Sequence, residues 1–300
     1  MSPTMLGLGP ADILLGSVVV AHDAGAAEHI AAWIEDLPVE RRPIVVAAGP
    51  ASRVLGRVVE RIAGPGELGA SLRRGSVLVS GTGWQSDVEH HARLMAKEVG
   101  LPTIAVLDHW VNYEERFLRA GQCVLPDELW VTDEFAFRLA CETFASTRVV
   151  LQPNSFLAST VDRVGPRTEM AAEVLIIGEP IRCRWRSDGG EVDEVAETIV
   201  SVLQRLDVPR DATIRVRPHP AQDHRECISL GSRLGAGFAG LATDSLVEGL
   251  QRSRWVLGME SSALVIAAEC DRVAVSCLPR SAHECRLPDA RILHARRVLS

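Results

Sequence analysis

Short apolar runs, each followed by a turn and then by a helical pattern, recur through the amino-terminal half of the chain. In the first, Ile13–Leu15 and Ser17–Ala21 are expected to supply a buried strand, His22–Gly25 contains a glycine, and the apolar residues that follow recur every three or four positions. The same order returns after Pro43–Ala47 and after Val77–Ser80. Strands that alternate with helices in this way are typical of a parallel sheet. The sequence therefore predicts a Rossmann-like α/β domain.

A carboxylate and an imidazole stand side by side where a fourth apolar run, Pro102–Leu107, ends. Asp108 and His109 follow this run directly, which is how the carboxyl end of a strand presents a general base. Trp110 and Tyr113 come next and offer flat aromatic faces to a sugar. In the alternative interpretation, Asp108 caps a helix and His109 hydrogen-bonds to the backbone. We expect catalysis from the first pair. The two aromatic residues are expected to bind a hydroxyl-bearing substrate, called the acceptor below.

The end of the first strand supplies a second set of polar residues. Asp23 is the alternative general base, and His22 and Gly25 are expected to line the acceptor site. The other interpretation is that Asp23 caps the following helix and Gly25 eases the turn. Trp84, in the glycine-containing loop after the third strand, is also assigned to the acceptor.

Regular periodicity lapses in the middle of the chain, where the sequence is polar and rich in turn residues. A new strand pattern begins at Glu173 and ends in a glycine turn. We therefore predict an amino-terminal domain at residues 1–151, a linker at 152–172 and a carboxyl-terminal domain at 173–300. A length of 300 residues is enough for two such domains, each with its own core.

Two strand ends in the carboxyl-terminal half carry unusual polar motifs. The segment Ile214–Pro220 alternates apolar residues with arginine and ends in Arg-Pro-His-Pro. Its two prolines fix φ and remove backbone donors, so the strand must stop there and His219 lies in a stiff loop. Some forty residues later, Arg254–Leu264 runs from a strand through Gly-Met-Glu into a Ser-Ser helix start. The carboxyl edge of an open α/β sheet is where ligands bind.

An Arg-x-His-Pro segment followed, one βαβ unit later, by a strand that ends in Gly-x-Glu-Ser-Ser resembles the carboxyl-terminal half of GT-B-type glycosyltransferases. Within this class it is most similar to the bacterial sialyltransferase and capsule polysaccharide transferase group. The order of Gly81–Gly83 and Asp108–Trp110 also resembles the amino-terminal half of sugar-nucleotide epimerases, without their usual acidic loop residues. The resemblance implies two Rossmann-like domains that face each other across a cleft.

The same resemblance implies that the carboxyl-terminal domain binds a nucleotide-activated sugar. The residues expected to contact this donor lie at three strand ends: Gly178, Glu179, Arg217, His219, Pro220, Glu260, Ser261 and Ser262. The arginine, the histidine and the serines are expected to neutralise the departing phosphate. In the alternative interpretation the serines cap a helix and the glutamate complements its dipole. Arg182, Arg184 and Arg186 form either a phosphate-facing row or a solvated loop.

Composition excludes several other classes of function. A net charge of −7 provides no electrostatic footprint for nucleic acid. No apolar run reaches the roughly 18 residues of a membrane span, and the start lacks a basic region followed by an apolar one, so we expect a cytoplasmic protein. No Asp-x-Asp pair occurs, and the histidines and cysteines form no recognisable zinc set. We therefore expect a metal-independent enzyme with no cofactor other than the nucleotide sugar.

These observations favour a glycosyltransferase that moves a sugar from a nucleotide to a hydroxyl group of a small molecule or glycan. The resemblance to sialyltransferases favours a CMP-linked donor, although no residue distinguishes cytosine from uracil. Two alternatives remain: a sugar-nucleotide epimerase or hydrolase of the same fold, and a non-catalytic GT-B-like binding protein. The sugar, the acceptor, the stereochemistry and the oligomeric state do not follow from the sequence.

Overall fold

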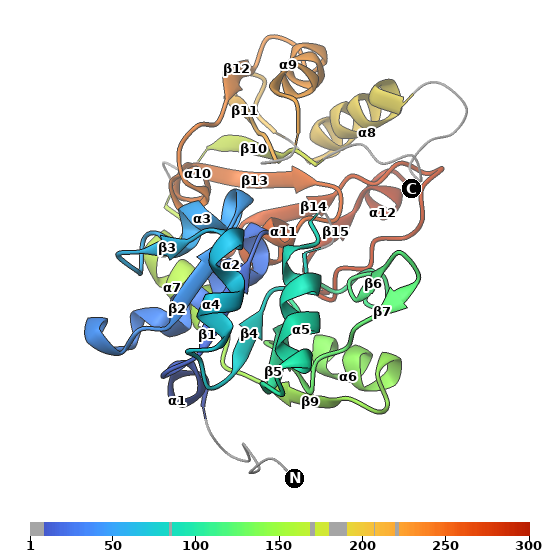
Figure 1. Cartoon of the computed structure of the whole chain (residues 1–300). Coiled ribbons are helices and arrows are strands. Elements are labelled where there is room, and N and C mark those ends of the chain that lie inside the picture. The colour runs from blue at the N-terminus through green and yellow to red at the C-terminus, as the bar shows by residue number, and fades with distance from the viewer. Residues whose placement is uncertain (1–8, 84–85, 169–171, 180–190, 207, 220–221) are drawn as a thin grey trace. The chain divides into compact units, whose positions relative to one another are not determined.

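The computed structural model describes residues 9–83, 86–168, 172–179, 191–206, 208–219 and 222–300. The chain divides into two compact units, Met1–Ser159 and Thr160–Ser300, each built on its own parallel sheet (Figure 1). No helix within the described ranges is long and apolar enough to cross a membrane.

Unit 1 contains a seven-stranded parallel sheet in the order β3-β2-β1-β4-β5-β8-β9. Its strands are β1 (Val18–Ala21), β2 (Ile44–Ala47), β3 (Ile62–Ala63), β4 (Leu78–Ser80), β5 (Thr103–Val106), β8 (Glu128–Val131) and β9 (Arg148–Leu151). A separate antiparallel hairpin is formed by β6 (Leu118–Arg119) and β7 (Gln122–Cys123). The order reverses between β1 and β4, which is the position where doubly wound sheets bind ligands.

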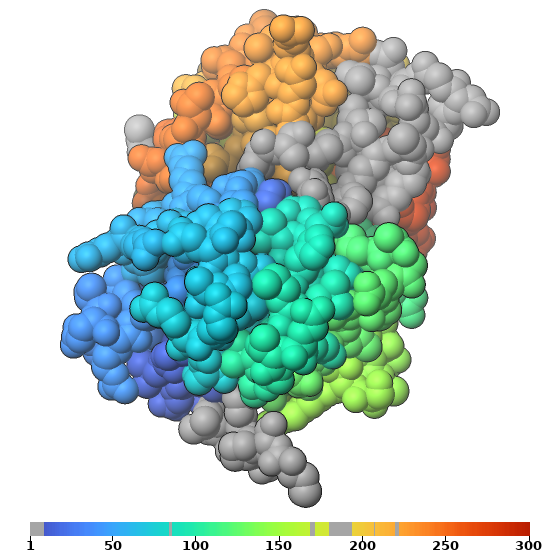
Figure 2. Space-filling model, in the orientation of Figure 1, coloured from blue at the N-terminus to red at the C-terminus, as the bar shows by residue number. Residues whose placement is uncertain are grey.

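Helices cover both faces of this sheet. They are α1 (Pro10–Leu14), α2 (Ala24–Glu35), α3 (Gly49–Leu55), α4 (Leu68–Leu72), α5 (Val88–Glu98) and α6 (Glu134–Thr143), with single turns η1 (Val39–Arg41) and η2 (Pro65–Glu67). Val19 packs in a core with residues of α1, α2 and α3, whereas Val18 and Val20 pack with residues of α4 and α5. Because successive strand residues point to opposite faces, the continuous apolar run of β1 fits a strand buried on both sides. The space-filling view shows one face of unit 1, coloured from blue to green (Figure 2).

Unit 2 repeats the same topology with a six-stranded parallel sheet in the order β12-β11-β10-β13-β14-β15. Its strands are β10 (Glu173–Ile177), β11 (Ile214–Arg217), β12 (Phe238–Leu241), β13 (Ser253–Gly258), β14 (Val273–Ser276) and β15 (Leu293–His294). Its helices are α8 (Glu191–Arg205), α9 (His224–Arg233), α10 (Leu246–Arg252), α11 (Ser262–Glu269) and α12 (Ala295–Val298). Here the order reverses between β10 and β13. The predicted α/β class with two Rossmann-like domains is confirmed.

Two expectations about local structure were wrong. Ile13 and Leu14, expected to belong to the first strand, end helix α1, because a proline at its first turn favours a helix start and Gly16 separates it from β1 at φ 71°. The stretch 152–172, expected to be an irregular linker, contains helix α7 (Ser155–Val164), which extends across the division between the units. Asn154 accepts a hydrogen bond from the N–H of Leu157 at 3.0 Å at the start of this helix.

Candidate functional site

The point in unit 1 where the strand order reverses brings an imidazole and a carboxylate together. His22 and Asp23 follow β1, and His22 Nδ1 lies 2.7 Å from Asp23 Oδ1. Asp23 occupies the N-cap position of α2, but its side chain accepts no hydrogen bond from that helix. The carboxylate therefore bonds to the imidazole instead of capping the helix. Because Nδ1 donates in this bond, Nε2 is the nitrogen that can accept a proton.

Asp108, at the end of β5, forms a second, deeper ion pair. Arg116 Nη1 lies 2.8 Å from Asp108 Oδ1 and also donates to the backbone and side-chain oxygens of Thr82. Burial alone would raise the pKa of Asp108, but the charges of Arg116, His109 and His29 outweigh it and lower that pKa below its ordinary value. Asp108 is therefore a poor proton acceptor near neutral pH.

Glycines make room for these side chains. A Cβ on Gly25, in the first turn of α2, would lie 1.8 Å from Asp108 Oδ2, and one on Gly49 would lie 2.6 Å from His22 Nε2. Gly49 also has φ 55°, a conformation that favours glycine. Gly25 was expected to ease a turn or line the acceptor site, and the structure adds that it permits the packing of Asp108 against helix α2.

Glu89, in the first turn of α5, was not identified from the sequence. Its side chain is fully buried, and Oε1 accepts a hydrogen bond of 3.0 Å from the backbone N–H of His22. Burial is the largest influence on its pKa and raises it, the His22 N–H and Arg93 lower it, and the Asp23 charge raises it again. The net effect raises the pKa of Glu89 to about 7, so a proton can reside on this group near neutral pH.

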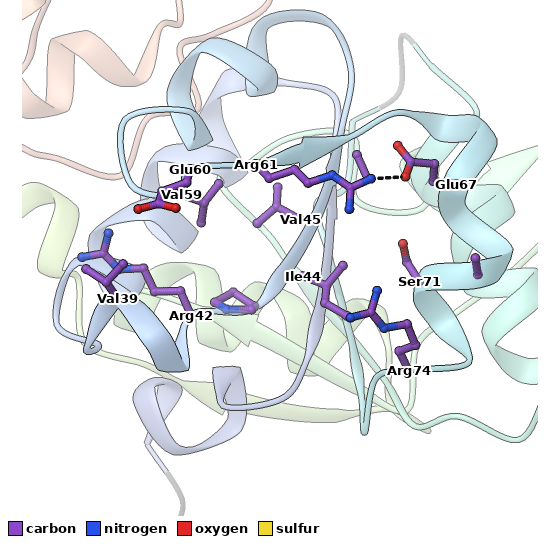
Figure 3. Close-up of a pocket in the computed structure, with 13 residues that line it drawn as sticks. Val39, Arg42, Ile44, Val45, Val59, Glu60, Arg61, Glu67, Ser71 and Arg74 are labelled. Atoms are coloured by element: carbon purple, nitrogen blue, oxygen red, sulfur yellow. Dashed lines mark hydrogen bonds and ion pairs between the residues drawn. The ribbon is translucent and has the colours of Figure 1, made fainter.

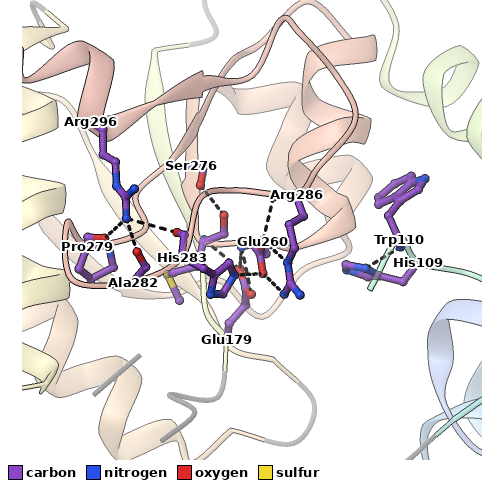
Figure 4. Close-up of polar contacts among 11 residues, drawn as sticks. His109, Trp110, Glu179, Glu260, Ser276, Pro279, Ala282, His283, Arg286 and Arg296 are labelled. Atoms are coloured by element: carbon purple, nitrogen blue, oxygen red, sulfur yellow. Dashed lines mark hydrogen bonds and ion pairs between the residues drawn. The ribbon is translucent and has the colours of Figure 1, made fainter. Parts of the chain in front are cut away.

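The other residues assigned to the amino-terminal site have mixed surroundings. His109 Nδ1 accepts a 2.9 Å hydrogen bond from the backbone N–H of Trp110 (Figure 4). The indole N–H of Trp110 donates to Asp133 at 2.8 Å. The Tyr113 side chain is 5% exposed and its ring stacks on Phe144, so this ring offers no open face to a sugar. Trp84 lies outside the described residues.

In unit 2, the equivalent reversal point lies between β10 and β13 and carries Gly178 and Glu179. A Cβ on Gly178 would lie 2.9 Å from the carbonyl oxygen of Arg217, so the adjacent chain requires a glycine here. The Glu179 carboxylate accepts hydrogen bonds of 2.9 Å from the backbone N–H groups of Met259 and Glu260 (Figure 4). These two N–H groups, which precede α11, therefore bind an internal carboxylate.

Glu260 fixes a loop that the sequence did not connect with the site. The residue is only 5% exposed. Its carboxylate accepts a hydrogen bond from His283 Nε2 at 2.8 Å and three from Arg286, whose N, Nε and Nη2 lie at 2.9, 3.1 and 2.7 Å (Figure 4). Although burial alone would raise the pKa of Glu260, these hydrogen bonds lower it to about 2. Four donors occupy a carboxylate that has about four lone-pair positions. Arg296 donates to carbonyl groups of the same loop, including those of Pro279 and Ala282.

The two motifs that prompted the donor-site prediction lie at the carboxyl ends of β11 and β13. Arg217 donates to the carbonyl oxygen of Asp244, and the His219 N–H donates to the Gln222 side chain at 3.4 Å. Ser261 Oγ accepts from the Ala263 N–H at 3.2 Å and caps α11, and Ser262 is the first residue of that helix. Pro220 and the arginines at 182, 184 and 186 lie outside the described residues.

A surface groove of about 260 Å³ lies elsewhere in unit 1, along β2 and β3 (Figure 3). Its polar lining includes Arg42, Arg61 and Arg74. Arg61 forms an ion pair with Glu67, and Arg42 donates to backbone carbonyl groups. None of the residues assigned to the acceptor or donor lines this groove.

Solved structures resemble most of the chain although their sequences differ. One is MnaA of S. aureus in complex with UDP, with a TM-score of 0.58 and 13% identity over 87% of this chain and 78% of that one. Another is the UDP-GlcNAc 2-epimerase of Neisseria meningitidis bound to UDP-GlcNAc, with a TM-score of 0.55 and 10% identity over 87% and 81%. A glycosyltransferase of Rickettsia africae has a TM-score of 0.52 and 8% identity over 87% and 79%.

The chain has the GT-B fold. The expected likeness to glycosyltransferases and, alongside them, to sugar-nucleotide epimerases is thereby confirmed at the level of the GT-B architecture. No protein-family model and no curated protein sequence matches the chain. Because proteins that share the GT-B fold catalyse different reactions, the function is argued from the residues at the strand ends.

Proposed function

We propose that the chain is a glycosyltransferase that uses a nucleotide sugar and in which His22 removes the proton from the acceptor hydroxyl. The observation that carries this proposal is the 2.7 Å contact between His22 Nδ1 and Asp23 Oδ1. Asp23 fixes the imidazole in the tautomer whose Nε2 accepts a proton, and it stabilises the imidazolium that forms. The acceptor oxygen then bonds to the anomeric carbon as the bond from that carbon to the phosphate oxygen breaks.

The proposed roles of the amino-terminal residues differ from those predicted from the sequence. His22 is the base, Asp23 orients it, and Asp108 holds Arg116 rather than taking a proton. A carboxylate whose pKa is lowered by a buried guanidinium accepts protons less readily than a neutral imidazole at neutral pH. His109, expected from the sequence to take part in catalysis, is proposed to contact the acceptor together with the Trp110 ring.

The second half of the proposal concerns the departing nucleotide. Arg217 and His219 at the end of β11, with Ser261 and Ser262 at the start of α11, are proposed to stabilise the negative charge of the phosphate. Arg286 joins this proposed set because Glu260 holds its guanidinium in a fixed orientation. Removal of one such donor typically costs roughly 10²–10³ in rate. The proposed reaction needs no divalent metal.

Calorimetric titration with CMP, CDP, UDP, GDP and ADP in the presence of EDTA tests the donor site. Selective binding of one nucleotide, weakened by Arg217→Ala, is expected and identifies the donor class. The corresponding nucleotide sugars are then incubated with a panel of hydroxyl-bearing acceptors, and products are identified by mass spectrometry. If no nucleotide binds, the transferase proposal fails and a non-catalytic binding protein becomes the better explanation.

An epimerase is the second candidate, and the two neighbouring carboxylates of Asp23 and Glu89 favour it. Epimerisation at a carbon requires one group that removes a proton and another that returns one, and the raised pKa of Glu89 suits the group that returns the proton. Incubation of UDP-GlcNAc in deuterium oxide distinguishes the two enzymes. An epimerase exchanges a sugar C–H for deuterium in the absence of an acceptor, whereas a transferase leaves all carbon-bound hydrogens in place.

A further inference from the structure

Two carboxylate oxygens lie next to a single glycine that follows β4. A Cβ placed on Gly83 would lie 2.6 Å from Asp23 Oδ2 and 2.8 Å from Glu89 Oε2. Gly81 makes a similar allowance, because a Cβ there would lie 2.5 Å from Glu89 Oε1. The two glycines thus create the space in which these oxygens face the same point. Two ionised carboxylates so placed would repel each other, and this repulsion is relieved when they share one proton.

The surroundings of Glu89 also favour a protonated carboxyl group. Oε1 accepts the His22 N–H, whereas Oε2 is buried and has no hydrogen-bond partner among the residues that the structure describes. The charged groups that influence it are Asp23 and His22 beyond β1 and Arg93 one turn later on α5. The Arg93 guanidinium donates to Ser80 Oγ and to the carbonyl oxygens of Gly81 and Val124. An unpaired, buried carboxylate oxygen is costly, and a proton on it removes that cost.

We propose that Glu89 is a positioning residue that carries a proton and donates it in a hydrogen bond from Oε2 to Asp23 Oδ2. Asp23 then binds a proton donor on each side, since its Oδ1 already faces His22 Nδ1. These two hydrogen bonds fix the orientation of the Asp23 carboxylate. The His22 ring is thereby held with Nδ1 toward Asp23 and with Nε2 on the opposite side, away from Asp23. The proposal rests on the proposed function in that it extends the dyad of His22 and Asp23 to three groups.

The shared proton sets the charge of the group. With Glu89 neutral, the three side chains together carry one negative charge, which becomes zero when His22 accepts the proton of an acceptor hydroxyl. With Glu89 ionised, a second negative charge lies buried beside Asp23 and the orienting hydrogen bond is lost. The raised pKa of Glu89, about 7, agrees with the protonated form at and below neutral pH.

Infrared difference spectroscopy between pH 5 and pH 9 tests this proposal without any substrate. The wild-type chain is expected to show the C=O stretch of a protonated carboxyl group with a midpoint near pH 7, and Glu89→Gln is expected to abolish it. Glu98→Gln is the matched control, because Glu98 is exposed on the same helix and its replacement should leave the band intact. A band that is absent from the wild type, or that persists in Glu89→Gln, overturns the proposal.

Asp23→Asn supplies a second test that does not depend on how Glu89→Gln folds. It removes the charge that favours the proton on Glu89, so the midpoint of the band is expected to move to lower pH. An unchanged midpoint would show that Glu89 is merely buried and would also overturn the proposal. Because neither measurement uses a nucleotide sugar, their failure is distinct from a failure of the proposed transferase activity.

Discussion

Replacement of Glu89 by glutamine is expected to stabilise unit 1 at pH 8 and to have little effect at pH 5. The carboxyl group ordinarily ionises near 4.5, but its pKa in the folded chain is about 7. Between these values the folded chain retains a proton that the unfolded chain has lost, so the free energy of unfolding falls by about 1.4 kcal/mol per pH unit. The contribution is complete below pH 4.5 and is lost as the pH rises through 7. The total loss is roughly 3 kcal/mol.

Glutamine reproduces the protonated glutamate in shape and can accept the His22 N–H while it donates to Asp23. The difference in unfolding free energy between Glu89→Gln and the wild type should therefore grow by roughly 3 kcal/mol from pH 5 to pH 8. Urea unfolding at pH 5, 6, 7 and 8 measures this difference. Tryptophan fluorescence suits the experiment, because four of the six tryptophans belong to residues 1–159.

Glu98→Gln serves as the control, since its exposed carboxyl group should give a pH dependence parallel to that of the wild type. The reasoning is refuted if the curves of Glu89→Gln and the wild type run parallel from pH 5 to pH 8. Parallel curves would mean that Glu89 ionises at the same pH in the folded and unfolded chains. That result would contradict the burial of Glu89 beside Asp23, which outweighs the opposing charge of Arg93 and raises the pKa.

Three further predictions concern the same unit. His22→Gln should lower kcat by roughly 10²–10⁴ with nucleotide binding unchanged by calorimetry, whereas His91→Gln, at an exposed position, should leave both unchanged. Gly25→Ala should destabilise the chain by about 1–3 kcal/mol in urea unfolding, because the added Cβ would lie 1.8 Å from Asp108 Oδ2. This clash outweighs the gain of about 1 kcal/mol in helix propensity. Gly66→Ala is the control and should not destabilise the chain, because a Cβ there has no atom within 4 Å. Arg116→Leu should cost about 3–5 kcal/mol, because it leaves a buried carboxylate unpaired, and unfolding by urea measures this loss.

The α/β class was predictable because each buried strand is a short apolar run that ends in a turn. Helix α7 and strand β9 were missed where that pattern weakens. The strand Arg148–Leu151 lies at the edge of the sheet, so two of its residues are exposed and two are only partly buried. The helix begins beside Pro153 and ends before Gly165, and these residues favoured an irregular stretch. Asn154 was the signal that marked the helix start.

The position of the chemistry was easier to predict than the roles of its residues. Strand ends identify His22, Asp23 and Asp108, because parallel strands deliver their carboxyl ends to one edge. Asp23 binds an imidazole and Asp108 binds a guanidinium. This division depends on side-chain conformations, which the sequence pattern does not specify. Glu89 was hidden because a glutamate in the first turn of a helix ordinarily complements the helix dipole at the surface. Gly81 and Gly83 were the sequence feature that pointed to Glu89, because both make room for its carboxylate. From the sequence alone, these glycines indicated only that the backbone could approach a ligand closely.

The two units place carboxylates at equivalent topological positions but give them opposite acid–base properties. Glu89 receives one backbone N–H and lies beside Asp23, and its burial outweighs the opposing charge of Arg93, so its pKa rises to about 7. Glu260 receives four donors from His283 and Arg286, and its pKa falls to about 2. Burial is common to both, so the number of donors decides the difference. A carboxyl group that keeps its proton near neutral pH is suited to proton transfer. A carboxylate that stays ionised is suited to binding and orienting cationic side chains. This contrast supports the proposal that the acid–base step belongs to unit 1 and the binding of phosphate to unit 2.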